Sequence, residues 1–243
     1  MSIKHVVTTC NKEGWDLYGE RMVRSYVKNW PYSIPLHVYA EGFELPAFLR
    51  VHQEQLPRWQ VEFKERHKDN PDAHGVGHKK PFKRQAVRFS HKVGAICDLA
   101  ERMDKGWLIW IDADTETKGP VTDEWLESLM PEGAFFALLQ RKDNHSECGF
   151  FIVNMAHECA RPFFQTLKKL YTSDELFRLP ETHDSYLIDR VLSLQIGGGW
   201  LNQDHVINLA RPGDNGHVWE RSVLARKLRH FKGDRKTMKG YNK

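Results

Sequence analysis

The chain contains the run Trp107-Leu108-Ile109-Trp110-Ile111-Asp112-Ala113-Asp114-Thr115, in which five apolar residues precede two acids. An uninterrupted run with aromatic and β-branched residues is typical of a strand buried on both faces. Because strand residues two apart point to the same side, Asp112 and Asp114 can aim both carboxylates at one place beyond the strand. Neighbouring carboxylates repel unless a cation lies between them, and hard divalent ions prefer oxygen ligands. The run has two interpretations. It forms a site for a divalent ion, Mn²⁺ or Mg²⁺, or it is a core strand followed by two turn-forming acids.

The composition predicts one α/β domain over residues 1–243. A chain of 243 residues with 40% hydrophobic content can bury a sizeable core. Lys and Arg total 36 against 32 Asp and Glu, a small basic excess that suits an anionic ligand such as a nucleotide but does not indicate nucleic-acid binding. Four widely spaced cysteines argue against a zinc site and a disulfide scaffold. The sequence shows neither a signal peptide nor an apolar run of about 20 residues that would span a bilayer, so we expect a cytoplasmic protein.

Three segments near the N-terminus predict a strand, a helix and a second strand. Residues 3–9 are rich in β-branched types, apolar residues of 18–30 recur every three or four positions, and 35–40 are again apolar. A strand-helix-strand unit this short indicates a parallel sheet, which binds ligands at the carboxyl ends of its strands. We expect a loop at residues 8–11 that either lies beside a nucleotide or only follows the strand. Its candidate binding residues are Thr8, Thr9 and Asn11.

A polar loop and a long helix are predicted next. Residues 63–84 are polar, contain Gly and Pro and lack periodicity, which favours a loop that covers a substrate or a solvated excursion. Residues 82–103 have helical spacing, and on that helix Arg88 and Lys92 share a face because they are four apart. Two cations without an acidic partner at matching spacing repel each other, so a diphosphate would stabilise them. Solvated basic residues are the alternative.

The second half of the chain predicts more strands and helices. Residues 115–121 resemble a turn, the apolar runs 133–139 and 147–154 predict strands, and residues 159–171 have helical spacing. A further helix begins near Asp184, where that acid or the nearby Thr182 would serve as the N-cap.

The C-terminal run Arg229-His230-Phe231-Lys232-Gly233-Asp234-Arg235-Lys236 has a regular spacing of three residue types. A glycine follows His230 by three positions, and a lysine follows that glycine by three more. Neutral imidazole completes a carboxylate metal site, glycine lets backbone approach a phosphate, and lysine neutralises diphosphate charge. The tail therefore favours the metal interpretation of Asp112 and Asp114.

On these residues the chain resembles a glycosyltransferase of the GT-A fold, and within that class the glycogenin and bacterial galactosyltransferase-like group called family 8. Asp112-Ala113-Asp114 is similar to the DxD motif that follows a buried strand, and residues 230–236 are similar to the HxxGxxK element near the C-terminus. The Gly149–Asn154 segment is similar to the family's GxxxxN strand. Asp184-Ser185 differs from the family's usual Asp-Gln pair.

The resemblance implies an α/β, GT-A-like fold with a mainly parallel central sheet, helices on both faces and a single Rossmann-like nucleotide-binding domain. Residues 1–120 would form the nucleotide-sugar-binding half, and residues 121–243 the acceptor half with a C-terminal metal- and diphosphate-binding element. The implied activity is metal-dependent transfer of a hexosyl or pentosyl group from a nucleotide-diphosphate sugar, with a UDP-sugar favoured. An acceptor hydroxyl would receive the sugar with retention of configuration.

The resemblance also assigns roles to residues. Asp112, Asp114 and His230 would be the metal ligands, and Asp184 or Glu147 would position the sugar or the acceptor. If one of those two acids acts as a general base, the enzyme would instead invert configuration. The nucleotide-sugar-binding residues would be Thr8, Thr9, Asn11, Arg88, Lys92, Asp112, Ala113, Gly233 and Lys236.

Two other classes of function remain open. A nucleotidyltransferase uses a similar sheet and acid-bound Mg²⁺, but the glycine-rich phosphate loop expected after the first strand is missing. A non-catalytic sugar- or nucleic-acid-binding module needs no paired metal acids. The basic tail, residues 226–243, would attract a polyanion, and the run 88–92 faintly resembles bacteriophage glycosyltransferases. A modified base in DNA is therefore an acceptor to test, in the host cytoplasm if a phage encodes the chain; a solvated tail is the alternative.

Overall fold

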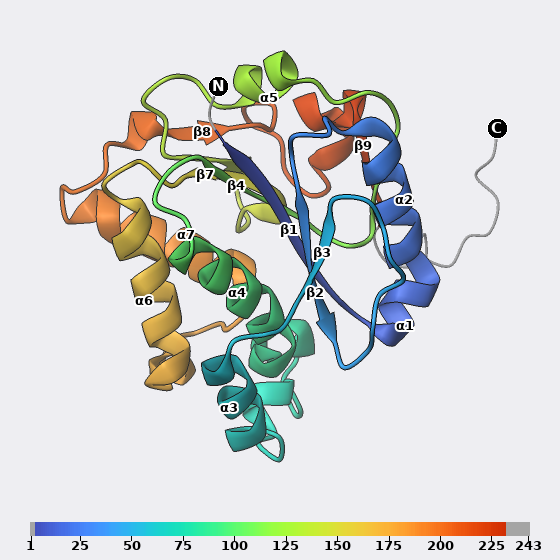
Figure 1. The fold of residues 1–243 in the computed structure, drawn as a ribbon. Helices are drawn as coiled ribbons and strands as arrows, with labels where there is room; N and C mark the ends of the chain where they lie inside the picture. The colour runs from blue at the N-terminus through green and yellow to red at the C-terminus, as the bar shows by residue number, and fades with distance from the viewer. Residues whose placement is uncertain (1–2, 232–243) are drawn as a thin grey trace.

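The computed structural model describes residues 3–231, whose strands form a seven-stranded sheet and a separate two-stranded sheet (Figure 1). The order in the large sheet is β3-β2-β1-β4-β7-β6-β8. Strand β7 runs antiparallel to both of its neighbours, and every other neighbouring pair is parallel. The predicted mainly parallel sheet is confirmed. The strands are β1 Lys4–Asn11, β2 Leu36–Glu41, β3 Val51–Glu54, β4 Trp107–Ile111, β5 Thr115–Thr117, β6 Phe136–Leu139, β7 Glu147–Asn154, β8 Val206–Asn208 and β9 Leu228–His230.

Helices cover both faces of the large sheet. Helices α3, α4, α6 and α7 gather on one side in Figure 1, and α1 and α2 lie on the other. Each face has its own apolar core: Val93 of α4 and Leu187 of α7 belong to one, and Met22 of α2 and Leu126 of α5 to the other. The helices are α1 Lys12–Gly14, α2 Glu20–Asn29, α3 Arg58–Arg66, α4 Ala86–Glu101, α5 Asp123–Leu129, α6 Ala160–Thr172 and α7 Asp184–Gly197, and a π-helical turn spans Trp15–Gly19.

Strand β4 lies at the centre of the sheet, between β1 and β7, and all five of its side chains are buried. Leu108 and Trp110 pack into one core, and Ile109 and Ile111 into the other, as the two-residue period of a strand requires. Burying each such side chain contributes about 1.5–3 kcal/mol. The strand predicted from the apolar run is therefore confirmed. Because β4 ends at Ile111, it places Asp112 and Asp114 just beyond the carboxyl end of the central strand.

Two segments predicted as loop or turn are strands. Strand β1 continues through residues 8–11, because its parallel ladder with β2 reaches as far as the pair Asn11 and Glu41. The predicted turn at 115–121 contains β5, which pairs antiparallel with β9. The pairing with β2 was predicted, but not how far along β1 it reaches; the partner of β5 is distant in sequence, and local turn chemistry gave no sign of it.

The polar stretch 63–84 is partly regular. Helix α3 extends to Arg66, and short 3₁₀ turns occupy Asp72–His74 and Pro81–Arg84. The carboxylate of Asp72 accepts hydrogen bonds from Nε and Nη2 of Arg84, at 3.0 and 2.5 Å, which closes the loop on itself. This bidentate pair holds the loop against the N-terminus of α4.

The four cysteines are free and buried. Within residues 3–231, no helix has both the length and the apolar character needed to cross a bilayer.

A cluster of histidines crosses β1, β2 and β3 and is expected to make stability depend on pH. The rings of His37 and His52 stack with centroids 5.3 Å apart, and Nδ1 of His5 lies 2.9 Å from Nε2 of His37. Burial, followed by the neighbouring imidazoles and Arg102, lowers the pKa of His5; burial likewise lowers the pKa of His37, although Glu54 opposes it. Protons therefore bind more weakly in the folded state than in the unfolded chain.

Because a depressed histidine pKa favours the unfolded chain in acid, the free energy of unfolding should fall as the pH drops below about 6.5. Thermal denaturation followed by circular dichroism between about pH 7.5 and about pH 5.5 measures this dependence. The variant His5→Gln should lose less stability over the same interval. An equal pH dependence in the variant and the original protein would contradict a role for His5.

Candidate functional site

The carboxyl end of β4 and strand β9 bring Asp112, Asp114 and His230 together. Backbone pairing sets this arrangement, because Thr115 of β5 is in register with His230 and the Phe231 amide donates to the Asp114 carbonyl oxygen at 2.9 Å. Nε2 of His230 lies 2.9 Å from Oδ1 of Asp114 and 3.6 Å from Oδ2 of Asp112. One ligand atom from each of the three residues falls within 4.8 Å of the others. Residues far apart in the sequence thus present two carboxylates and one imidazole to a common point.

Gly149 of β7 makes room for the His230 ring. A Cβ atom at position 149 would lie 2.9 Å from Cε1 and 3.2 Å from Nδ1 of His230, and 3.1 Å from the ring of Trp219. Side chains larger than hydrogen would therefore displace the imidazole. The same glycine accepts a hydrogen bond from the Asp112 amide at 2.8 Å, so it helps to place two of the three residues.

Glu147 lies behind His230. Its Oε1 is 3.8 Å from Nδ1 of His230, its Oε2 is 3.8 Å from Arg141, and it is only 4% exposed. A carboxylate on the outer nitrogen of an imidazole fixes the ring's orientation and tautomer. The structure therefore places a carboxylate, Glu147, near the outer nitrogen of His230 at 3.8 Å, and Glu147 is not part of the wall of the cavity that Asp112 and Asp114 line.

Lys92 of α4 is a buried cation between two acids. Its Nζ lies 2.7 Å from Oδ2 of Asp184 and 3.2 Å from Oδ1 of Asp112, and it also donates to the Cys148 carbonyl oxygen. Burial alone would lower the lysine pKa, but the two carboxylates outweigh it and raise that pKa. Burial would raise the pKa of Asp184, and the lysine charge outweighs it and lowers that pKa. Both groups stay charged.

Arg88 and Lys92 lack an acidic partner at helical spacing, as predicted, but the inference that Lys92 needs a diphosphate to balance its charge is wrong, because Asp112 and Asp184 already pair with it. Its acidic partners come from the end of β4 and from α7, so they do not occur at helical spacing in the sequence. Arg88 is exposed and donates to Oε1 of Gln85 at 3.1 Å. Of these two basic residues, Arg88 is therefore the one positioned to bind an anionic ligand directly.

The N-cap of α7 is His183, whose side chain accepts from the Tyr186 amide. The prediction that Thr182 or Asp184 caps this helix is therefore wrong. Because the imidazole takes the capping position, the carboxylate of Asp184 at the next position is free to turn toward Lys92.

A cavity of about 660 Å³ opens in front of Asp112 and Asp114. Of the predicted nucleotide-sugar-binding residues, Thr8 is 1% exposed and lies within β1, away from the cavity wall. Gly233 and Lys236 lie outside the described residues. The predicted residues that line the cavity are Thr9, Asn11, Arg88, Lys92, Asp112, Ala113, Asp114 and Asp184.

Other residues of the cavity wall were missed from the sequence. Glu41 ends β2 beside β1 and accepts a hydrogen bond from Oγ1 of Thr9 at 3.0 Å, and its Oε2 lies 2.9 Å from Nδ1 of His91. The position of Glu41 in the cavity wall could have been predicted from the sequence, because ligands bind at the carboxyl ends of neighbouring parallel strands. Tyr18 also lines the cavity, and burial, with Asp114 second, raises its pKa to about 12. No sequence pattern marked Tyr18.

The donor set of Asp112, Asp114 and His230 fits a divalent cation. Trp110 Nε1 donates to Oδ1 of Asp112 at 2.7 Å and Lys92 contacts the same oxygen, which leaves Oδ2 of Asp112 on the side of His230. Two carboxylates with one imidazole suit Mn²⁺ and are acceptable to Mg²⁺, since carboxylate oxygen is the preferred ligand of both. The arrangement can hold such an ion at the edge of the cavity.

Neither a family model nor a curated protein matches this sequence. Among solved structures, mouse xyloside xylosyltransferase 1 in its apo form superimposes with a TM-score of 0.51 at 11% identity, and the match covers 85% of each chain. The glycosyltransferase GlyE of Streptococcus pneumoniae TIGR4 superimposes with a TM-score of 0.49 at 14% identity, over 85% of this chain and 45% of that one. The fold is therefore the GT-A-like α/β fold of glycosyltransferases, as the resemblance implied. Membership of family 8 and a phage origin stay predictions.

Proposed function

We propose that this chain is a metal-dependent glycosyltransferase that transfers a sugar from a nucleotide-diphosphate sugar, with a UDP-sugar favoured, to an acceptor hydroxyl. Asp112, Asp114 and His230 would hold Mn²⁺ or Mg²⁺. We further propose that residues 1–243 form one domain, in which 1–120 bind the donor and 121–243 form the acceptor side. Transfer of a hexosyl or pentosyl group with retention follows from the family resemblance.

The observation that carries this proposal is the meeting of the three side chains beside the cavity, whose wall includes Asp112 and Asp114 but not His230. Asp112 and Asp114 follow the central strand, whereas His230 arrives from β9, and only the folded chain places Nε2 of His230 within 3.6 Å of both carboxylates. The cavity in front of them, about 660 Å³, is large enough for a nucleotide-sized ligand.

In the proposed mechanism each side chain has a defined task. A divalent ion, when bound, supplies Lewis-acid stabilisation of the negative charge that grows on the departing nucleoside diphosphate. Arg88 at the rim contributes a guanidinium to the same phosphates. Asp184, held ionised by Lys92, accepts hydrogen bonds from hydroxyl groups of the transferred sugar. Glu147, whose Oε1 lies 3.8 Å from Nδ1 of His230, places a negative charge on the side of the ring that faces away from the two ligand carboxylates.

The proposal specifies the acceptor only as a molecule with a hydroxyl group. Of the predicted basic tail, residues 226–243, the structure describes only 226–231, and DNA as an acceptor finds no support.

The proposed function is tested by incubating the purified protein with a panel of nucleotide sugars in Mn²⁺, in Mg²⁺ and in excess chelator. Release of a nucleoside diphosphate from one donor, abolished by chelator, is the expected result, because many transferases slowly hydrolyse their donor. With pyrophosphate added, conversion of the nucleotide sugar into a nucleoside triphosphate and a sugar 1-phosphate would instead identify a nucleotidyltransferase. Binding of a sugar or nucleotide with no metal dependence and no bond cleavage would favour a non-catalytic module.

Replacing Gly149 by alanine should weaken metal binding without unfolding the protein. The added methyl group lies 2.9 Å from the His230 ring, so the imidazole must move away from the carboxylates. We expect the affinity for Mn²⁺ to fall by about 10–100-fold, the range seen when groups that orient a ligand are lost, with a stability cost of about 1–3 kcal/mol. Titration calorimetry measures the affinity, and urea denaturation the stability.

Gly119→Ala is the matched control, because a Cβ atom at that position meets nothing within 4 Å. A folded Gly149→Ala protein with unchanged Mn²⁺ affinity would remove His230 from the proposed ligand set.

A further inference from the structure

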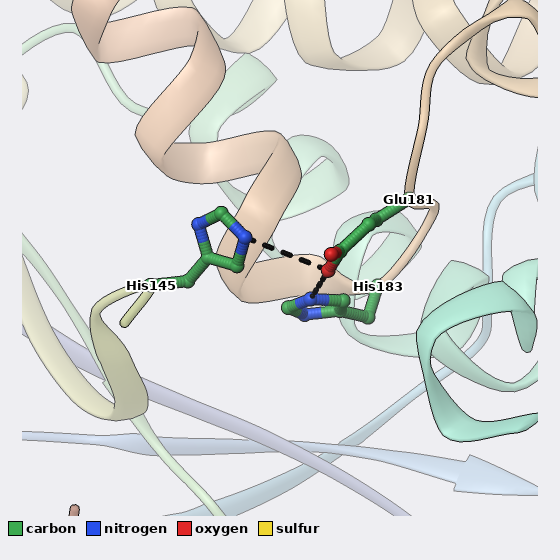
Figure 2. A group of neighbouring side chains, drawn as sticks. All are labelled: His145, Glu181 and His183. Carbon is green, nitrogen blue, oxygen red and sulfur yellow. Dashed lines mark hydrogen bonds and ion pairs between the residues drawn. The ribbon is translucent and has the colours of Figure 1, made fainter. Parts of the chain in front are cut away.

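A second group of potential metal ligands lies apart from the Asp112, Asp114 and His230 site. It consists of His145, which precedes β7, and Glu181 and His183, which precede α7 (Figure 2). Nε2 of His183 lies 2.7 Å from Oε2 of Glu181, and Nε2 of His145 lies 3.5 Å from the same oxygen. Figure 2 shows both imidazole rings directed at this one carboxylate from different segments of the chain.

The spacing is close to that of a tetrahedral zinc site. Nitrogen and oxygen ligands at about 2.0–2.2 Å from Zn²⁺ are roughly 3.3–3.5 Å apart from one another. The distance from His145 to Glu181 already has this value, and His183 would need to move away from Glu181 by a fraction of an ångström. Lys83 donates to Oε1 of Glu181, which leaves Oε2 as the single oxygen offered to an ion.

The surroundings orient the two rings. Oδ2 of Asp189, on α7, lies 3.6 Å from Nδ1 of His145 and accepts the Ser146 amide at 2.8 Å, so a carboxylate faces the nitrogen of the ring that is not turned to Glu181. A carboxylate on the outer nitrogen is the usual support of a metal-binding histidine. The side chain of His145 is 35% exposed, and an ion can reach the group from that side.

Binding at His183 requires one internal proton shift. While Nδ1 accepts the Tyr186 amide at 3.4 Å, the proton resides on Nε2 and is donated to Glu181. An ion on Nε2 displaces that proton to Nδ1, where Oδ1 of Asp184 lies 4.0 Å away. The capping hydrogen bond that is lost is long and therefore weak.

We propose that His145, Glu181 and His183 bind a zinc-type divalent ion, with water as a fourth ligand. Two imidazoles and one carboxylate favour Zn²⁺, whereas the site at Asp112 and Asp114, with its two carboxylates, favours harder ions such as Mn²⁺ and Mg²⁺. The bound ion fastens the segment before β7 to the N-terminus of α7, and that N-terminus carries Asp184. The site thus stabilises the wall of the cavity from outside it.

The test uses the full-length protein in an Asp114→Ala background, which removes the other candidate metal site. After chelator treatment and dialysis, Zn²⁺ is titrated by calorimetry, and bound zinc is counted by elemental analysis. One zinc per chain is expected, together with a rise in the thermal midpoint on adding Zn²⁺. Substituting Co²⁺ for the bound Zn²⁺ should give the visible absorption spectrum of a tetrahedral Co²⁺ site.

Adding His145→Ala should lower the zinc affinity by more than about 100-fold, beyond what disturbed surroundings alone produce, and remove the Co²⁺ absorption. Because His145 is partly exposed, circular dichroism should be unchanged. The exposed His217 supplies the matched control, His217→Ala, which should bind zinc normally. Absence of stoichiometric zinc in the Asp114→Ala protein, or zinc binding unaffected by His145→Ala, would overturn the proposal, whatever the outcome of the donor assay.

Discussion

Replacing Asp114 by alanine should abolish donor turnover while the fold survives. The carboxylate is 6% exposed and lies 2.9 Å from His230, at the centre of the proposed ligand set. Loss of a direct ligand should reduce the rate by more than about 100-fold, the upper limit for groups that only orient a ligand. The fold should persist because β5 and β9 are joined through backbone groups, including the Asp114 carbonyl oxygen, which alanine retains.

Nucleoside diphosphate release measures the effect, and circular dichroism and thermal denaturation verify the fold. Asp104→Ala is the matched control: this aspartate precedes β4, its side chain is 91% exposed, and it pairs only at the surface with Arg161. Its variant should retain nearly full turnover. A fully active Asp114→Ala enzyme would eliminate the metal assignment and return Asp112 and Asp114 to the role of turn residues.

Replacing Lys92 by methionine should cause the largest loss of stability of any single change considered. Methionine keeps the length of the side chain but leaves Asp184 and Asp112 facing each other without the ammonium group between them. Removing one partner of a buried ion pair costs about 3–5 kcal/mol. Urea denaturation measures the free energy of unfolding, and turnover should fall as well, since both carboxylates line the cavity.

The double variant Lys92→Met, Asp184→Asn separates charge from packing. Because it removes the most buried of the uncompensated charges, it should recover part of the lost stability but not the activity. Lys105→Met, at an exposed lysine just before β4, should leave stability within about 0.5 kcal/mol of the original. A Lys92→Met protein as stable as the Lys105→Met control would show that the buried charges do not depend on Lys92.

Elements with strong apolar patterns could be predicted from the sequence. Strand β7 begins and ends where the sequence placed it, at Glu147 and Asn154, and β4 follows from five consecutive buried residues. The βαβ unit gave the parallel pairing of β1 with β2. Helix α3 and strand β3 were missed, because β3 is largely exposed and therefore lacks the alternation that a half-buried strand shows.

Only some of the residues of the candidate site could be predicted from the sequence. Spacing placed Asp112 and Asp114 together, and the tail spacing added His230, whereas contacts between distant segments left no local trace. The ion pair of Lys92 with Asp184 joins α4 to α7, and the group of His145 with Glu181 joins two other segments. Such pairs depend on which helices the sheet brings side by side, and this information lies in tertiary packing.

Metal-dependent nucleotide binding is the property that most directly distinguishes a metal site at Asp112 and Asp114 from a pair of turn residues. Calorimetric titration of the purified protein with UDP, GDP, CDP and ADP, in Mn²⁺ and in excess chelator, measures whether the acids at the end of β4 bind a nucleotide through a metal. We expect one of these nucleotides to bind in Mn²⁺, and we expect both the chelator and the Asp114→Ala substitution to abolish that binding. Equal binding with and without metal, or in the original protein and the Asp114→Ala variant, would contradict the proposed metal site.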